Sequence, residues 1–140
     1  MNSDKEMKEI LLSIKTIASV GLSSSDEKES YWIVSYLKEQ GYRIIPVNPK
    51  ATEILGEKVY ASLSDIPDKV DVVQVFRKSE DVPPVVDEAI KIGAKVVWMQ
   101  EGIVNEEAAQ KAREAGLQVV MNACMRMTHR RLIGAKTVQL

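Results

Sequence analysis

Residues 93–99 have the sequence Gly93-Ala94-Lys95-Val96-Val97-Trp98-Met99, a glycine followed by a largely apolar and β-branched run. The same arrangement occurs at Gly41-Tyr42-Arg43-Ile44-Ile45-Pro46-Val47 and at Gly116-Leu117-Gln118-Val119-Val120-Met121. Each run follows a helical pattern. Glycine adopts the left-handed conformation that commonly ends a helix, and uninterrupted apolar runs are typical of strands covered on both faces. The three stretches therefore predict three helix–strand pairs in a parallel sheet.

Working outward from these stretches, the remaining chain completes an alternation of strands and helices. Residues 16–20 and 70–75 have strand composition. The helices expected to cover the sheet lie at residues 31–40, 83–92 and 105–115, where apolar side chains recur at helical spacing. Alternating strands and helices form right-handed βαβ units. The sequence therefore predicts an α/β fold.

The predicted architecture is a single Rossmann-like, doubly wound domain over residues 1–140. Its five-stranded parallel sheet is expected to have the order 3-2-1-4-5, with helices on both faces. An additional helix is expected at residues 4–14, before the first strand, because apolar side chains recur there at helical spacing. Residues 51–67 are expected to form an ordered connection with local turns.

Composition excludes several classes of protein. The 140 residues, 45% hydrophobic and 28% charged, suit one globular domain. Nineteen Lys and Arg against twenty Asp and Glu leave a net charge of −1, so we expect no binding to nucleic acid or to anionic membranes. No apolar run approaches the roughly 18 residues that span a bilayer. The single cysteine, Cys124, allows neither an intrachain disulfide nor a multi-thiolate metal site, which favours a cytoplasmic protein without a metal.

Ligands of doubly wound sheets bind beyond the carboxyl ends of the strands, so the loops there hold the candidate site. The loop after the first strand begins Gly21-Leu22-Ser23-Ser24-Ser25 and leads into a helix. It carries one glycine rather than the G-x-G-x-x-G pattern of dinucleotide-binding proteins. Backbone amides and serine hydroxyls at such a helix start can bind phosphate. The candidate residues in this loop are Gly21, Ser23, Ser24, Ser25 and Ser30.

The second strand is followed by Asn48-Pro49-Lys50. An NAD-binding domain usually has a carboxylate at the end of this strand, which binds the ribose hydroxyls. Here the carboxylate is missing and Lys50 offers a positive charge instead, with Pro49 restricting the backbone and Asn48 available to bind sugar or phosphate oxygens. This pattern predicts an adenine nucleotide with a phosphorylated ribose, either coenzyme A or NADP.

The third and fourth loops add three candidate residues. Phe76, the only phenylalanine, is expected to form a wall for the adenine or the pantetheine, and Arg77 adds a cation beside it. Gly102 would let a ligand approach the backbone closely.

Several stretches together resemble the small stand-alone CoA-binding proteins, a family similar to the amino-terminal domain of the succinyl-CoA synthetase alpha subunit. These stretches include Gly21-Leu22-Ser23, Val47-Asn48-Pro49-Lys50, Val75-Phe76-Arg77-Lys78-Ser79-Glu80 and Glu101-Gly102-Ile103. The resemblance implies coenzyme A bound across the carboxyl edge, with its pyrophosphate near Gly21 and its phosphorylated ribose near Lys50. The synthetase's phosphorylated histidine lies in a second domain, so the resemblance implies noncatalytic binding of CoA or acyl-CoA.

Two alternative functions stay open. An NADP-dependent reductase or redox sensor would share the missing carboxylate. A protein-interaction module would use an exposed aromatic stripe, formed by Trp32 and Tyr36 four residues apart on one helix, to bind a second copy or another protein. We expect Cys124 and the only histidine, His129, to be packed structural residues rather than a catalytic pair.

Overall fold

The structure is a computed structural model that describes residues 2–136. Its centre is a sheet in which all neighbouring strands are parallel. The five strands of this sheet are β1 (Thr16–Val20), β2 (Arg43–Val47), β5 (Val72–Val75), β6 (Val96–Met99) and β7 (Gln118–Val120).

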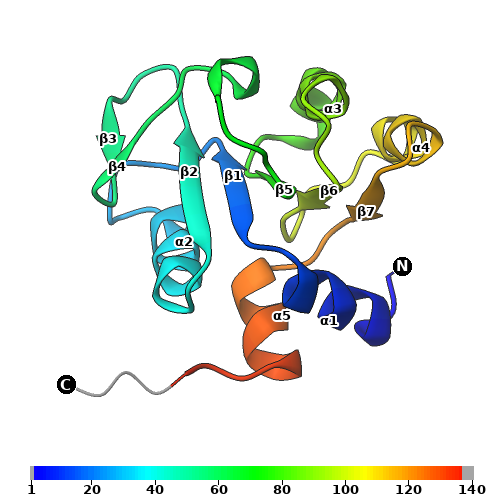
Figure 1. The fold of residues 1–140 in the computed structure, drawn as a ribbon, viewed down its shortest axis with the longest axis horizontal. Coiled ribbons are helices and arrows are strands. Elements are labelled where there is room, and N and C mark those ends of the chain that lie inside the picture. Colours follow the sequence, from blue (N-terminus) through cyan, green and yellow to red (C-terminus); the bar gives the residue numbers. More distant parts are fainter. Residues whose placement is uncertain (1, 137–140) are drawn as a thin grey trace.

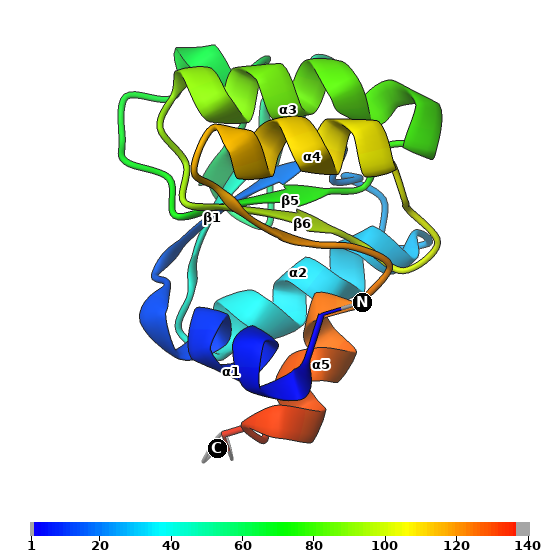
Figure 2. The same cartoon turned by 90° about the vertical axis from the view of Figure 1, so that its right-hand side faces the viewer.

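Helices cover both faces of the sheet, as predicted (Figures 1 and 2). One face carries α3 (Val82–Lys91) and α4 (Glu106–Glu114). The other face carries α1 (Asp4–Ser13), α2 (Glu29–Glu39) and α5 (Met125–Leu132). Each layer buries its own hydrophobic cluster against the sheet. The helix α5 was not predicted, whereas the other four lie where the sequence indicates.

The connection after β2 is ordered, also as predicted. It forms a short hairpin from β3 (Glu53–Ile54) and β4 (Glu57–Lys58), followed by a 3-10 turn at Leu63–Asp65. A second 3-10 turn, Ser79–Asp81, precedes α3. None of the helices within residues 2–136 is long and apolar enough to cross a membrane.

The predicted strand order is wrong. The observed order is β2-β1-β5-β6-β7, which is 2-1-3-4-5 when the parallel strands alone are counted. The third strand therefore pairs with the first strand rather than with the second.

Pro46 gives the physical reason for this difference. The Pro46 carbonyl accepts from Tyr60 N at 3.0 Å on the side of β2 that faces away from β1. The nitrogen and the carbonyl of one strand residue point to the same side, so the missing N–H of Pro46 also lies on the outer side. Proline is tolerated in a sheet where its nitrogen faces an edge. The outer side of β2 is accordingly occupied by the bridge from Val47 to Tyr60 and not by a further strand.

Candidate functional site

The strand order places the crevice between β1 and β5, where successive connections leave the sheet in opposite directions. Phe76 N donates to Val20 O at 2.9 Å, so the loops that follow these two strands are in contact. Gly21 has a φ of +86°, and a Cβ added there would lie 3.4 Å from Phe76 and from Arg77. The structure therefore brings Gly21, Phe76 and Arg77 together, and it explains why position 21 is a glycine.

The serine loop is ordered by its own hydroxyls. Ser30 Oγ accepts from Ser23 N at 3.2 Å, and Ser23 Oγ accepts from Ser25 N at 3.1 Å. Ser25 Oγ accepts in turn from Glu27 N at 3.2 Å, while Ser24 is exposed. Each hydroxyl that accepts a backbone N–H keeps its own proton for donation. The predicted serines therefore shape the loop and still offer donors along it.

Asn48 joins two loops at the end of β2. Its Nδ2 donates to Leu22 O at 3.0 Å, and its Oδ1 accepts from Lys50 N at 2.8 Å. Each end of the Asn48 amide has one protein partner, which leaves its second amide proton and a second lone pair available, so the contact with sugar or phosphate oxygens stays a prediction. Asn48 instead fixes the position of Lys50 relative to the serine loop.

Pro49 and Lys50 lie exposed at the end of β2. In the described part of the chain, no carboxylate forms an ion pair with Lys50; the pairs that do form involve other cations. An unpaired lysine beside a loop rich in donors is suited to an anionic ligand group.

A pocket of about 480 Å³ opens at the same edge of the sheet, between the start of α2 and the loops after β5 and β6. Of the predicted residues it includes Ser30 and Phe76. The other lining residues are Glu29, Ile33, Gln100, Glu101, Ile103 and Cys124. Gln100 and Glu101 follow β6 directly, so the rule that placed Gly102 in the site could also have found them. The same rule does not identify Cys124, because β7 ends at Val120 and Cys124 does not directly follow it.

Gly102 lies beside this pocket and does not line it. Its φ is +84° and the space where a Cβ would stand is open. Gly102 N donates to Asn122 Oδ1 at 2.7 Å. The glycine therefore serves the turn after β6, and the surface above it is accessible.

Of the two residues of the predicted aromatic stripe, only Trp32 is exposed. Trp32 is 51% exposed, and its Nε1 donates to Asp26 O at 2.7 Å. Tyr36 is partly buried, because α5 covers it and its Oη lies 2.8 Å from His129 Nδ1. The expectation of an exposed stripe is wrong at Tyr36, because α5, the helix that was not predicted, covers this side chain.

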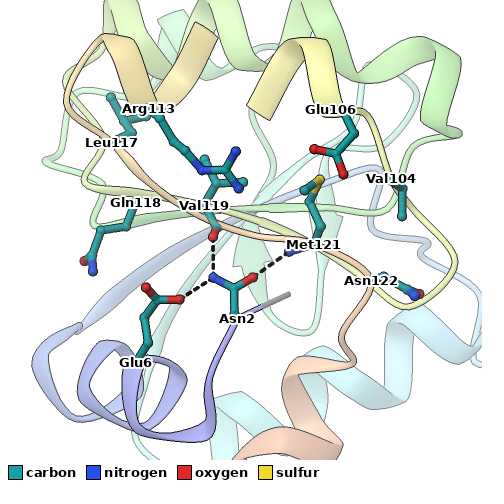
Figure 3. A pocket seen from close by; sticks show the side chains of 10 residues that line it. All are labelled: Asn2, Glu6, Val104, Glu106, Arg113, Leu117, Gln118, Val119, Met121 and Asn122. Carbon is teal, nitrogen blue, oxygen red and sulfur yellow. Dashed lines mark hydrogen bonds between the residues drawn. The ribbon is translucent and has the colours of Figure 1, made fainter. Parts of the chain in front are cut away.

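Two further hollows lie near β7, one along the strand itself and the other between α1, α5 and the segment that follows β7. One, of about 470 Å³, is shown in Figure 3. Asn2 Nδ2 donates there to Val119 O at 2.7 Å, and Asn2 Oδ1 accepts from Met121 N at 3.4 Å. The Asn2 amide thus pairs with the edge strand as a neighbouring strand would. None of the predicted site residues lines these hollows.

Comparisons with known proteins show the family of this chain. The sequence profile of a family described as "CoA binding domain" matches residues 15–130. The "Uncharacterized protein YneT" of Bacillus subtilis is 44% identical over 127 residues, which cover 91% of this chain and 94% of that protein. A solved structure of a "hypothetical protein from Pyrococcus horikoshii OT3" is 48% identical with a TM-score of 0.92, covering 95% of this chain and 94% of that one.

Ligases are also similar to this chain. The "Acetate--CoA ligase [ADP-forming] I subunit alpha" of Pyrococcus furiosus is 34% identical over 128 residues. That match covers 80% of this chain but 28% of the ligase subunit. The chain thus corresponds to one part of the larger protein.

Proposed function

The chain belongs to the CoA-binding domain family, and from that membership we propose that it binds coenzyme A or acyl-CoA without catalysing a reaction on it. In this proposal residues 1–140 act as one cytoplasmic CoA-binding domain. One observation carries the placement of the ligand. The close approach of Gly21 to Phe76 and Arg77 brings the loops after β1 and β5 together at the switch point of the sheet, where a ligand crevice is expected, and the unpaired Lys50 follows the neighbouring strand β2.

The two charged parts of CoA match the cations and donors of this crevice. Lys50 lies where the phosphorylated ribose would reach the end of β2. The hydroxyl protons of Ser23 and Ser25 can donate to the pyrophosphate, and Arg77 adds a positive charge from the opposite loop. The phosphate groups therefore fit the β1–β2 side of the edge.

The uncharged pantetheine arm matches the pocket. Glu29 and Glu101 stand on the pocket wall, so a phosphate group there would face two carboxylates. Phe76, Ile33 and Ile103 supply apolar surface. This division of charge supports a ligand that is anionic at one end and neutral at the other.

Cys124 and His129 support a noncatalytic role. Cys124 lines the pocket, but His129 does not. His129 is 4% exposed, and its Nδ1 is taken by Tyr36 Oη. A cysteine nucleophile needs a base within hydrogen-bond reach, and His129 is instead directed toward α2.

The proposal is tested by comparing CoA with dephospho-CoA, which lacks the ribose phosphate, in isothermal titration. Lys50→Ala should weaken CoA binding by about 1–3 kcal/mol, because a charge-assisted contact is lost. Its affinity for dephospho-CoA should stay at the wild-type value. Lys69→Ala removes an exposed lysine before β5, at the opposite edge of the sheet, and should bind both ligands normally.

Absence of binding to CoA at millimolar concentration would refute the proposal. NADPH is titrated under the same conditions. A preference for NADPH over CoA would favour the NADP-dependent alternative.

A further inference from the structure

Three buried polar side chains form a hydrogen-bonded row below the crevice. Ser19, Gln74 and Gln100 are 0%, 0% and 4% exposed; Ser19 and Gln74 lie near the carboxyl ends of β1 and β5, and Gln100 directly follows β6. Ser19 Oγ donates to Gln74 Oε1 at 2.8 Å, and Gln74 Nε2 donates to Gln100 Oε1 at 3.1 Å. The row therefore runs in one direction across β1 and β5 and ends at the Gln100 amide.

The orientation of the Gln100 amide is set by the start of α5. Met125 N donates to Gln100 Oε1 at 3.0 Å. A backbone N–H can only donate, so the Gln100 atom that faces it has to be the oxygen. With two donors on its oxygen, the Gln100 amide directs its nitrogen away from both of them.

The Gln100 nitrogen has no acceptor among residues 2–136. The backbone of Gln100 is already paired, since its N donates to Val75 O and its O accepts from Ile103 N. In the described part of the chain, Arg126 Nε is the one side-chain polar atom that is both inaccessible and unpaired. Gln100 Nε2 is therefore solvent-accessible, and the space next to it is the pocket that Gln100 lines.

The surroundings decide which acceptor fits this donor. Glu29 and Glu101 on the same wall oppose an anionic acceptor such as a phosphate or a carboxylate. The apolar side chains of Ile33, Phe76 and Ile103 favour a neutral chain. The acceptor that meets both conditions is an uncharged carbonyl oxygen.

We propose that Gln100 is a specificity residue of this pocket, and that its Nε2 donates to a carbonyl oxygen of the neutral arm of the ligand, either a pantetheine amide or an acyl thioester. This inference rests on the proposed function, because it assumes that the nucleotide part of CoA lies in the neighbouring crevice. The rigid Ser19–Gln74–Gln100 row would hold the donor in place before the ligand arrives.

The test uses Gln100→Glu, which keeps an oxygen for Gln74 and Met125 and replaces the donor with a second oxygen. The affinities for acetyl-CoA, which carries both kinds of carbonyl, and for adenosine 3′-phosphate 5′-diphosphate are compared, since the latter has the same nucleotide and no pantetheine. We expect acetyl-CoA binding to fall about tenfold or more, while the truncated nucleotide binds as to wild type. Gln118→Glu makes the same chemical change at an exposed position of β7 and should alter neither affinity.

Two further ligands identify the carbonyl. Acetyl-CoA carries a thioester carbonyl, and ethyl-CoA is the thioether without it. If the thioester is the acceptor, wild type prefers acetyl-CoA and Gln100→Glu abolishes the preference. If a pantetheine amide is the acceptor, Gln100→Glu weakens CoA, acetyl-CoA and ethyl-CoA by the same factor. Either pattern supports the inference.

The inference is overturned if Gln100→Glu changes the affinities for acetyl-CoA and for the truncated nucleotide equally, or changes neither. That result would leave CoA binding itself intact, whereas failure of wild type to bind CoA would refute the proposed function. If Gln100→Glu does not fold, the side-chain amide protons of Gln100 are followed by NMR in the wild type. They should shift when acetyl-CoA is added and stay unchanged with the truncated nucleotide. Unshifted amide protons with bound acetyl-CoA would also overturn the inference.

Discussion

Gly21 is the residue at which two loops of the crevice touch. Its left-handed φ of +86° disfavours any side chain, and the Cβ position lies 3.4 Å from both Phe76 and Arg77. In a non-glycine residue the left-handed conformation alone costs roughly 1–2 kcal/mol. The crevice and the stability of the loop therefore both depend on the absence of a Cβ atom at position 21.

We predict that Gly21→Ala lowers the free energy of unfolding by about 1–2 kcal/mol and also weakens CoA binding, because the new methyl group presses on Phe76 and Arg77. Gly116→Ala is the matched control. Its φ is +93° and no atom lies within 4 Å of its Cβ position, so it should lose a similar amount of stability and bind CoA normally. Denaturant unfolding and calorimetric titration measure the two effects. Normal CoA binding by Gly21→Ala would contradict this account of the crevice.

At the scale of elements, a cluster around His129 joins the three helices of one face. The His129 ring lies edge-on to Tyr36 of α2 and to Tyr42, with ring centroids 5.4 Å and 5.7 Å away. Tyr42 Oη donates to Leu11 O of α1 at 2.6 Å. Burial, together with the charge of Lys136, lowers the pKa of His129 below its usual value. The cluster therefore depends on a neutral histidine.

The pH dependence of stability follows from this cluster. The unfolded chain protonates His129 near pH 6.5, before the folded chain does. Proton uptake thus favours unfolding, and stability should fall as the pH decreases from about 6.5 toward the folded pKa. His129 is the only histidine, so His129→Phe should flatten the curve between about pH 7 and 5.

Urea unfolding at a series of pH values measures this effect. Tyr36→Phe serves as the control, since it removes the hydrogen bond and keeps the titrating ring. It should be less stable than wild type by about 0.5–1.5 kcal/mol with its pH slope retained. Equal slopes for wild type and His129→Phe would show that another group is responsible.

At the scale of the whole molecule, the carboxyl ends and the amino ends of the parallel strands have different roles. At the amino edge, the Asp71 carboxylate accepts from Lys15 N at 2.8 Å and from Thr16 N at 3.1 Å, and it pairs with Lys95 at 3.5 Å. Burial raises the pKa of Asp71, but these backbone hydrogen bonds and the Lys95 charge outweigh burial and lower the pKa overall. Asp71 therefore ties three strands together at the edge opposite the crevice.

Asp71→Ala should separate stability from binding. It leaves two backbone N–H groups without an acceptor, so we expect the free energy of unfolding to fall by about 1–3 kcal/mol. CoA affinity, measured well below the melting temperature, should not change. In the wild type the Asp71 contribution should be lost as the pH falls below about 3.8, the usual value for an aspartate, toward the lower folded pKa. A large drop in CoA affinity for Asp71→Ala would show that the two edges are coupled.

The elements predicted correctly share a local signal. Asn105 is an example, because its side chain accepts from Ala108 N at 2.9 Å and so caps α4 at the start of the predicted helix over residues 105–115. The helix α5 lacks such a signal. It follows Cys124, whose side chain makes no capping hydrogen bond, and its residues are mostly polar. Pro46 favours an edge position for β2, but the sequence alone does not show that Tyr60, rather than another strand, pairs with the outer side of β2.

The sequence alone determined the alternation of helices and strands, the positions of the loops at the carboxyl edge and the membership of Gly21, Lys50 and Phe76 in those loops. These features follow from the spacing of nearby residues and from the conformations that glycine and proline allow. Only the tertiary structure decided the strand order, the covering of Tyr36 by α5 and the free donor of Gln100. Each of these depends on contacts between residues far apart in the chain, such as Tyr36 with His129 across 93 positions, and local spacing carries no record of such contacts.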